Sequence, residues 1–144
     1  MKQITTEIEI SAPPEKVWKI LNDFDHWAQW NTTVTKASGG STINSQLNIT
    51  MSDENGKDSN AYSPVIIQTE APKLLHWRAK MMAHFLFSND KIIELEATST
   101  GTKMTHREKF SGLMVKAFWG KMKEGVPPIL NSMNRDLKTA AEKN

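Results

Sequence analysis

The stretches that decide the fold are ITTEIEI at residues 4–10, SAPPEKVW at residues 11–18 and FDHWAQWN at residues 24–31. In the first stretch the isoleucines fall on one parity and the glutamates on the other, which predicts a strand with one buried face. The second stretch predicts an abrupt helix start, because proline is tolerated in the first helical turn, where its missing N–H would be unpaired anyway. The third stretch places two tryptophans where a short amphipathic segment meets the sheet.

Alternating apolar and polar residues between turn signals predict six further strands. Asn55-Gly56 readily provides the positive φ values of a tight hairpin turn. The seven predicted strands cover about residues 3–11, 33–37, 46–52, 62–70, 74–80, 87–98 and 103–111. Helices are predicted at about residues 14–22, around Trp27 and Trp30, and along the C-terminal region, with an apolar connection at residues 81–86.

The C-terminal region is predicted to be helical because apolar residues from Val115 to Ala140 recur at steps of three and four. Gly125 and Pro127-Pro128 interrupt this pattern, and an interior proline removes a hydrogen bond and clashes with the preceding turn. We therefore expect a kink or break there, with the longer regular helix at residues 127–142. The preceding piece is then expected to act as a movable flap over a pocket entrance.

Composition narrows the class of protein. The chain has 144 residues, enough for one domain (1–144) with a substantial core. Charged residues make up 24% and the net charge is +2, with lysines and acids intermixed, so we expect no nucleic-acid partner. No apolar run is long enough to span a bilayer and the N-terminus lacks a signal-peptide core, so we expect a cytoplasmic protein without stable membrane insertion.

Metal and cofactor chemistry find no support in the sequence. Cysteine is absent, which excludes disulfides, thiol catalysis and thiolate metal sites. The four histidines are scattered and lack helical i,i+4 partners, and no phosphate-binding loop or nucleophile motif is present. We therefore expect neither a metal nor a cofactor, and the sequence names no protein partner.

Antiparallel strands joined by short turns and followed by a helix predict an α+β fold with the helix packed on one face of the sheet. If residues 87–98 and 103–111 are neighbouring strands, Glu94 and Glu96 belong opposite Arg107 and Lys109 on the solvent face. The same parity sends His106 and Glu108 inward. A buried carboxylate is costly unless it is paired or wetted, so these two residues are partners, ligand contacts or rim residues near water.

Several segments together resemble the START-like (SRPBCC, helix-grip) superfamily and its bacterial polyketide-cyclase group. They are residues 12–18, 27–31, 72–78, 101–112 and 133–138. The resemblance implies a curved antiparallel seven-stranded sheet that grips a long C-terminal helix, with two short helices between the first two strands. It also implies a cavity for an apolar small molecule. Members of the superfamily include carriers, cyclases, hydroxylase domains and chaperone activators, so the fold alone does not choose among them.

Three functions remain open at this point. The first is binding or carriage of a small, largely apolar molecule in a cavity of a few hundred Å3 or more between sheet and helix. The expected lining is Trp30, Leu47, Ile49, Trp77, Leu95, His106, Glu108, Phe110, Phe118, Trp119 and Met133. The second is a cyclase or dehydratase in which His106 and Glu108 are the acid/base pair. The third is a co-chaperone-like interaction domain, which requires an exposed apolar patch.

Overall fold

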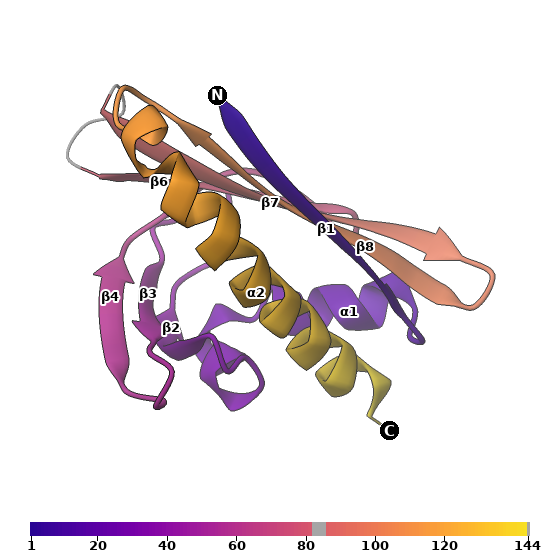
Figure 1. The fold of residues 1–144 in the computed structure, drawn as a ribbon. Helices are drawn as coiled ribbons and strands as arrows, with labels where there is room; N and C mark the ends of the chain where they lie inside the picture. Colours follow the sequence, from indigo (N-terminus) through magenta and orange to yellow (C-terminus); the bar gives the residue numbers. More distant parts are fainter. Residues whose placement is uncertain (82–85, 144) are drawn as a thin grey trace.

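The structure is a computed structural model that describes residues 1–81 and 86–143 (Figure 1). Its helical elements are α1 (Pro14–Leu21), the 3-10 helix η1 (Phe24–Gln29) and α2 (Val115–Glu142). Its strands are β1 (Lys2–Ile10), β2 (Val34–Ser38), β3 (Asn48–Ser52), β4 (Asp58–Tyr62), β5 (Val65–Glu70), β6 (Leu74–Met81), β7 (Phe87–Thr98) and β8 (Gly101–Ser111). The predicted α+β class is confirmed, and most of the predicted apolar connection at 81–86 lies outside the described residues.

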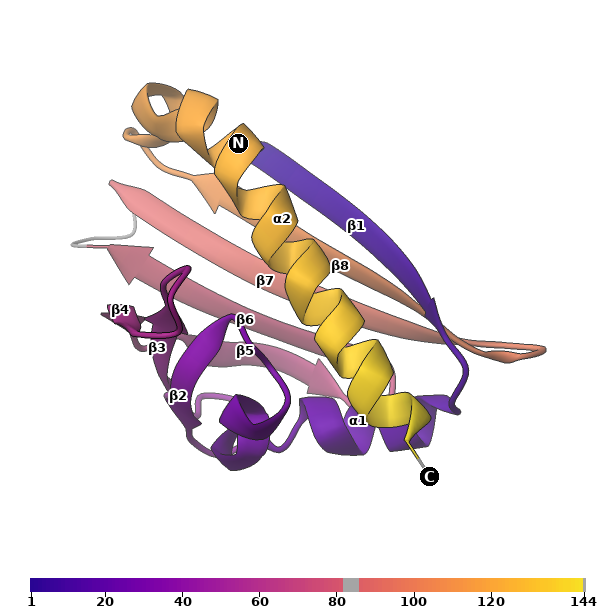
Figure 2. The ribbon, with the colours of Figure 1, turned by 60° about the horizontal axis from the view of Figure 1, so that its bottom comes forward.

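The strands form two antiparallel sheets, whereas the sequence predicted one sheet of seven strands. The larger sheet has five strands in the order β1-β8-β7-β6-β5, and the smaller has three in the order β2-β3-β4. Figures 1 and 2 show α2 lying across one face of the larger sheet, with the smaller sheet beside the helix. The predicted curved sheet around a long C-terminal helix is therefore confirmed, but its division into strands was wrong.

Pro64 explains the error. The sequence predicted one strand over residues 62–70, but β4 ends at Tyr62 and β5 begins at Val65. Proline cannot donate a ladder hydrogen bond, so it ends a strand or starts another. The two sheets stay linked, because Leu47 N–H donates to the carbonyl of Pro64 and Ile66 N–H donates to that of Ser45. Residues 44–47 thus bridge the edge of β5 to the start of β3.

The helix α2 is continuous from Val115 to Glu142, so the predicted break at Gly125 and Pro127-Pro128 is wrong. The two prolines deprive the carbonyls of Lys123 and Glu124 of their helical donors. Both of these residues are exposed, so water can hydrogen-bond to their carbonyls. Apolar contacts on either side hold both halves of α2 against the same sheet face.

The paired strands β7 and β8 confirm the predicted inward face. Ile93 is the register partner of His106, and Lys91 is that of Glu108. On the outer face Arg107 forms an ion pair with Glu94, and Glu96 lies opposite Lys103. The predicted charge pairing differs at Lys109, which lies opposite Asp90 rather than opposite Glu96.

Apolar side chains beneath α2 form two clusters. The main core packs η1 and α1 against the sheet and the C-terminal half of α2, and includes Trp27, Trp77 and Leu137. A smaller cluster beneath the N-terminal half of α2 contains Phe110 and Leu130. Along the inner face of β8, Met104 belongs to the main core and Phe110 to the smaller cluster. The polar residues His106 and Glu108 lie between them in the strand.

Candidate functional site: a pocket under the C-terminal helix

A pocket of about 530 Å3 opens between α2, the inner face of the larger sheet and β4. Its lining residues are Met51, Asn60, Ala61, Tyr62, Ala79, Lys80, Phe87, Asn89, Glu108, Phe110, Val126, Ile129 and Leu130. The apolar lining comes largely from α2 and from the smaller apolar cluster. The pocket has the predicted size and lies between sheet and helix, but it is partly open to solvent rather than enclosed.

A second, inner pocket of about 40 Å3 adjoins the first. The two share Met51, Tyr62, Glu108, Ile129 and Leu130 as lining residues, so these side chains stand where the pockets meet. The inner pocket is also lined by Trp27, Thr33, Val34, Lys91 and Met133. A molecule in the larger pocket thus has the buried Lys91 and the partly buried Glu108 at its inner end.

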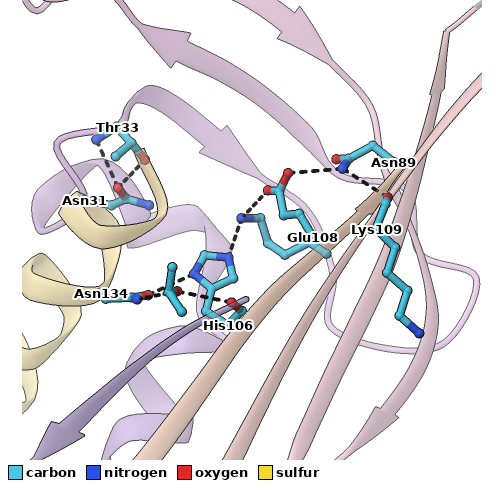
Figure 3. A network of polar contacts seen from close by, with 9 residues as sticks. Asn31, Thr33, Asn89, His106, Glu108, Lys109 and Asn134 are labelled. Carbon is cyan, nitrogen blue, oxygen red and sulfur yellow. Dashed lines mark hydrogen bonds and ion pairs between the residues drawn. The ribbon is translucent and has the colours of Figure 1, made fainter. Parts of the chain in front are cut away.

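Lys91 is the centre of a polar layer that crosses the inner face of the sheet. Its Nζ lies 2.9 Å from Glu108 Oε1 and 2.7 Å from His106 Nε2. It also lies 5.8 Å from the centre of the Trp77 ring, within the range of a cation–π contact. The other carboxylate oxygen of Glu108 accepts a hydrogen bond of 3.1 Å from Asn89 Nδ2 (Figure 3). The partly buried carboxylate is therefore neutralised by Lys91.

His106 is held as a neutral imidazole with its proton on Nδ1. Nε2 faces the lysine ammonium and must accept, so Nδ1–H donates to Asn134 Oδ1 at 2.8 Å (Figure 3). Complete burial and then the charge of Lys91 hold the pKa of His106 well below its ordinary value, against the opposing hydrogen bond with Asn134. Each ring nitrogen is occupied by a protein group.

The polar layer also fastens α2 to the sheet. Asn134 Nδ2 donates to Thr6 Oγ1 at 2.9 Å, and the Thr6 hydroxyl donates to the carbonyl of His106 at 3.1 Å. The helix, β1 and β8 are thus joined through one closed set of hydrogen bonds. Since each of these donors meets an acceptor, the layer holds the three elements in one relative position.

Tyr62 presents a protonated phenol at the junction of the two pockets. Burial, and then the negative charge of Glu108, raise the pKa of the phenol. The phenol is therefore available as a hydrogen-bond donor beside a carboxylate acceptor.

The structure separates the eleven predicted lining residues into three groups. Glu108, Phe110 and Met133 line one or both pockets. Leu47, Ile49, Trp77, Leu95 and His106 are buried, and Trp30 packs against the main core as a partly buried residue. Phe118 is 42% exposed, and Trp119 packs its ring on Phe110 with a centroid distance of 6.2 Å. The helix thus lines the larger pocket with Val126, Ile129 and Leu130 from its middle turns, and not with Phe118 and Trp119.

The predicted partnership of His106 and Glu108 is indirect. Both point inward, but Lys91 lies between them and contacts each. Sequence reasoning missed Lys91, although the parity that places Ile93 and Leu95 inside also places Lys91 inside. It also missed Tyr62 and Asn134, which reach the site from other elements and carry no local sequence signal.

Within residues 1–81 and 86–143, histidine and acidic side chains do not form a group of three that could hold a metal ion. None of the helices in the described part of the chain combines the length and apolar character that a membrane span requires. The arrangement is suited to enclosing an apolar group and hydrogen-bonding one small polar group.

Solved structures with a similar fold include proteins of different kinds. One is the di-domain ARO/CYC protein StfQ from the steffimycin biosynthetic pathway, with a TM-score of 0.79 and 10% identity over 97% of this chain and 50% of that chain. Another is an AHSA1-like protein from Aeromonas hydrophila, with a TM-score of 0.72 and 19% identity over 99% of this chain and 97% of that chain. A hypothetical protein from Helicobacter pylori has a TM-score of 0.78 and 13% identity over 98% of this chain and 88% of that chain. At these identities the likeness shows the fold alone, and this chain spans half the length of StfQ.

A comparison with curated proteins finds no match to the chain. The model of one protein family, described as polyketide cyclase / dehydrase and lipid transport, matches residues 1–142. The predicted membership of the START-like (SRPBCC) superfamily is therefore confirmed, and the chain belongs to the polyketide cyclase / dehydrase and lipid transport family.

Proposed function

We propose that this protein binds or carries a small, largely apolar molecule in the pocket between α2 and the inner face of β7 and β8. The observation that carries the proposal is the pocket of about 530 Å3, a size typical of small-molecule sites. Phe87, Phe110, Val126 and Leu130 give it apolar walls, and a few polar groups gather toward one end. The family description, which includes lipid transport, supports the same proposal.

The cyclase or dehydratase alternative has weaker support. It needs His106 and Glu108 to act on a substrate as an acid/base pair. Glu108 lines both pockets, but His106 is 0% exposed and both of its ring nitrogens are occupied. A general acid or base must come within hydrogen-bond reach of the reacting group, and His106 does so only if the polar layer rearranges. Glu108 and Tyr62 remain the groups available to an enzyme.

The co-chaperone-like alternative would rest on exposed apolar residues. Leu113, Phe118 and Ile129 are exposed in the described part of the chain. A co-chaperone-like domain binds its partner on such a surface and needs no pocket for a small molecule. Since the chain has a pocket of that kind, ligand binding is the better-supported function.

Two measurements test ligand binding. Native mass spectrometry of the purified protein is expected to show a population with an added small-molecule mass that disappears on denaturation. The neutral fluorescent probe N-phenyl-1-naphthylamine is expected to bind with an increase in emission that saturates at one equivalent. If no mass is added and the probe shows no saturable binding, the proposed function is wrong.

A further inference from the structure

The inner pocket is small and lies at the polar end of the larger one. Its volume of about 40 Å3 is less than a tenth of the 530 Å3 of the larger pocket. The larger pocket therefore has room for the apolar body of a ligand, and the inner one for a small polar group. The hydrogen-bonding groups where the two pockets meet decide which polar group is favoured there.

The hydrogen-bonding capacity at the junction determines what this polar group must be. Among residues 1–81 and 86–143, each oxygen of Glu108 has one donor, Lys91 for Oε1 and Asn89 for Oε2. A carboxylate oxygen accepts about two hydrogen bonds, so Glu108 retains free acceptor capacity. The Lys91 ammonium, in contrast, already contacts His106 and Glu108 and lies over the Trp77 ring. The junction therefore offers a ligand an acceptor at Glu108.

Tyr62 adds a donor at the same place. It lines both pockets together with Glu108, and its phenol stays protonated because burial and then the Glu108 charge raise its pKa. A hydroxyl group both donates and accepts, so it can donate to Glu108 while accepting from Tyr62. A carboxylate anion has no proton to donate and would place its charge beside that of Glu108.

We infer that the natural ligand is an apolar molecule with one uncharged hydroxyl group, an alcohol or a phenol, and that Glu108 selects it over the corresponding carboxylate. This inference rests on the proposed function, because it names the class of molecule that the pocket accepts. It assigns to Glu108 the role of a specificity-determining residue and to Lys91 the role of pairing with that carboxylate and holding it in place.

The test compares two molecules of equal chain length, 1-decanol and decanoate, at pH 8, where decanoate is ionised. Each displaces bound N-phenyl-1-naphthylamine from the wild-type protein, and the loss of probe emission gives its affinity. We expect 1-decanol to bind at least about tenfold more tightly than decanoate, since juxtaposed like charges oppose binding strongly.

Three variants assign the selectivity to the junction. In Glu108→Gln the preference for 1-decanol is expected to shrink several-fold, mainly because decanoate binds better. Tyr62→Phe removes only the phenol oxygen and is expected to weaken 1-decanol several-fold while changing decanoate little. Glu70→Gln makes the same charge change as Glu108→Gln at an exposed position and is expected to behave as the wild type. Circular dichroism checks that each variant is folded.

The outcomes separate the two proposals. If the probe does not bind the wild type, the proposed function fails and the inference fails with it. If the probe binds but decanoate competes as well as 1-decanol, or neither competes, the inference is overturned while the proposed function stands. A preference for 1-decanol that is unchanged in both Glu108→Gln and Tyr62→Phe also overturns it. Because the wild-type comparison needs no variant, the test holds even if Glu108→Gln does not fold.

Discussion

At the scale of the residue, Lys91 is the polar partner of two groups at once, the partly buried Glu108 and the buried His106. It neutralises Glu108 and donates to His106, and both contacts lie within 2.9 Å. Removing one partner of a buried ion pair leaves an uncompensated charge, which costs more than removing both partners. The polar layer should therefore be strongly coupled.

A double-mutant cycle measures this coupling. Lys91→Met is expected to lower the free energy of unfolding by about 3 kcal/mol or more, since Glu108 loses its cation. Adding Glu108→Gln to Lys91→Met is expected to recover part of that loss. Urea denaturation of the wild type, the two single variants and the double variant gives the interaction energy. Additive effects of the two changes would contradict the account of Lys91 as the neutralising partner.

The buried neutral His106 makes stability depend on pH. Its pKa in the folded protein lies well below the ordinary 6.5, so the unfolded chain takes up a proton first as the pH falls. The contribution to stability is complete above the ordinary pKa and is lost as the pH falls from there toward the folded pKa. Between pH 6.5 and 5.5 the free energy of unfolding is expected to drop by about 1 kcal/mol on this account.

Urea denaturation at several pH values checks this dependence against two variants. In His106→Gln the free energy of unfolding is expected to fall less steeply between pH 6.5 and 5.5 than in the wild type. His26→Gln serves as the control, because a hydrogen bond with Asp23 raises the pKa of the exposed His26 and gives its contribution the opposite sign. If the free energy of unfolding falls equally steeply with pH in the wild type and in His106→Gln, His106 does not cause the pH dependence.

At the scale of the element, the two halves of α2 differ in how they are held. The C-terminal half contributes Met133, Leu137 and Ala141 to the main core, and Asn134 fastens it to β8 and β1. The N-terminal half packs on the smaller apolar cluster through residues such as Trp119 and Val126. It also contains Gly120 and Gly125, each of which costs a helix about 1 kcal/mol relative to alanine.

Hydrogen exchange tests whether the N-terminal half of α2 acts as a flap over the pocket. Amides of residues 115–126 are expected to exchange faster than those of residues 130–141, because the first group packs on fewer buried residues and precedes the two prolines. Pro128→Ala, at an exposed position, restores one helical donor and is expected to bring the two rates closer together. Equal protection on both sides of Gly125 in the wild type would argue against the flap.

Local patterns predicted some elements well and others poorly. The β7–β8 hairpin was predictable because Glu94 and Glu96 alternate with apolar residues and Gly101 marks the turn. At Gly101 a Cβ atom would collide with the carbonyl oxygen of Ile10, so the turn requires a glycine. The continuity of α2 was not predictable from the sequence, because packing on both sides of Pro127-Pro128 outweighs the local cost of the prolines. The polar layer was only half predictable, since parity turns Glu108 inward but Asn134 reaches it from a helix far along the chain.

At the scale of the whole molecule, a packed core and an open pocket share one helix. The main core fills the space beneath the C-terminal half of α2, so residues such as Trp77 and Leu47 stabilise the fold rather than lining the pocket. The pocket lies between β4 and the middle turns of the helix, next to the polar layer. The three-stranded sheet thus supplies a pocket wall through Met51 and Tyr62.

The most direct test of the central claim is a titration of two phenylalanine variants with N-phenyl-1-naphthylamine. Ala79 lines the pocket from β6, and Ala79→Phe fills part of it. Ala117 is exposed on α2, so Ala117→Phe adds the same side chain outside the pocket. We expect Ala79→Phe to weaken probe binding by about tenfold or more, which is about 1.4 kcal/mol, and Ala117→Phe to bind as the wild type does. Equal affinities in both variants, with both folded by circular dichroism, would contradict binding between the sheet and the C-terminal helix.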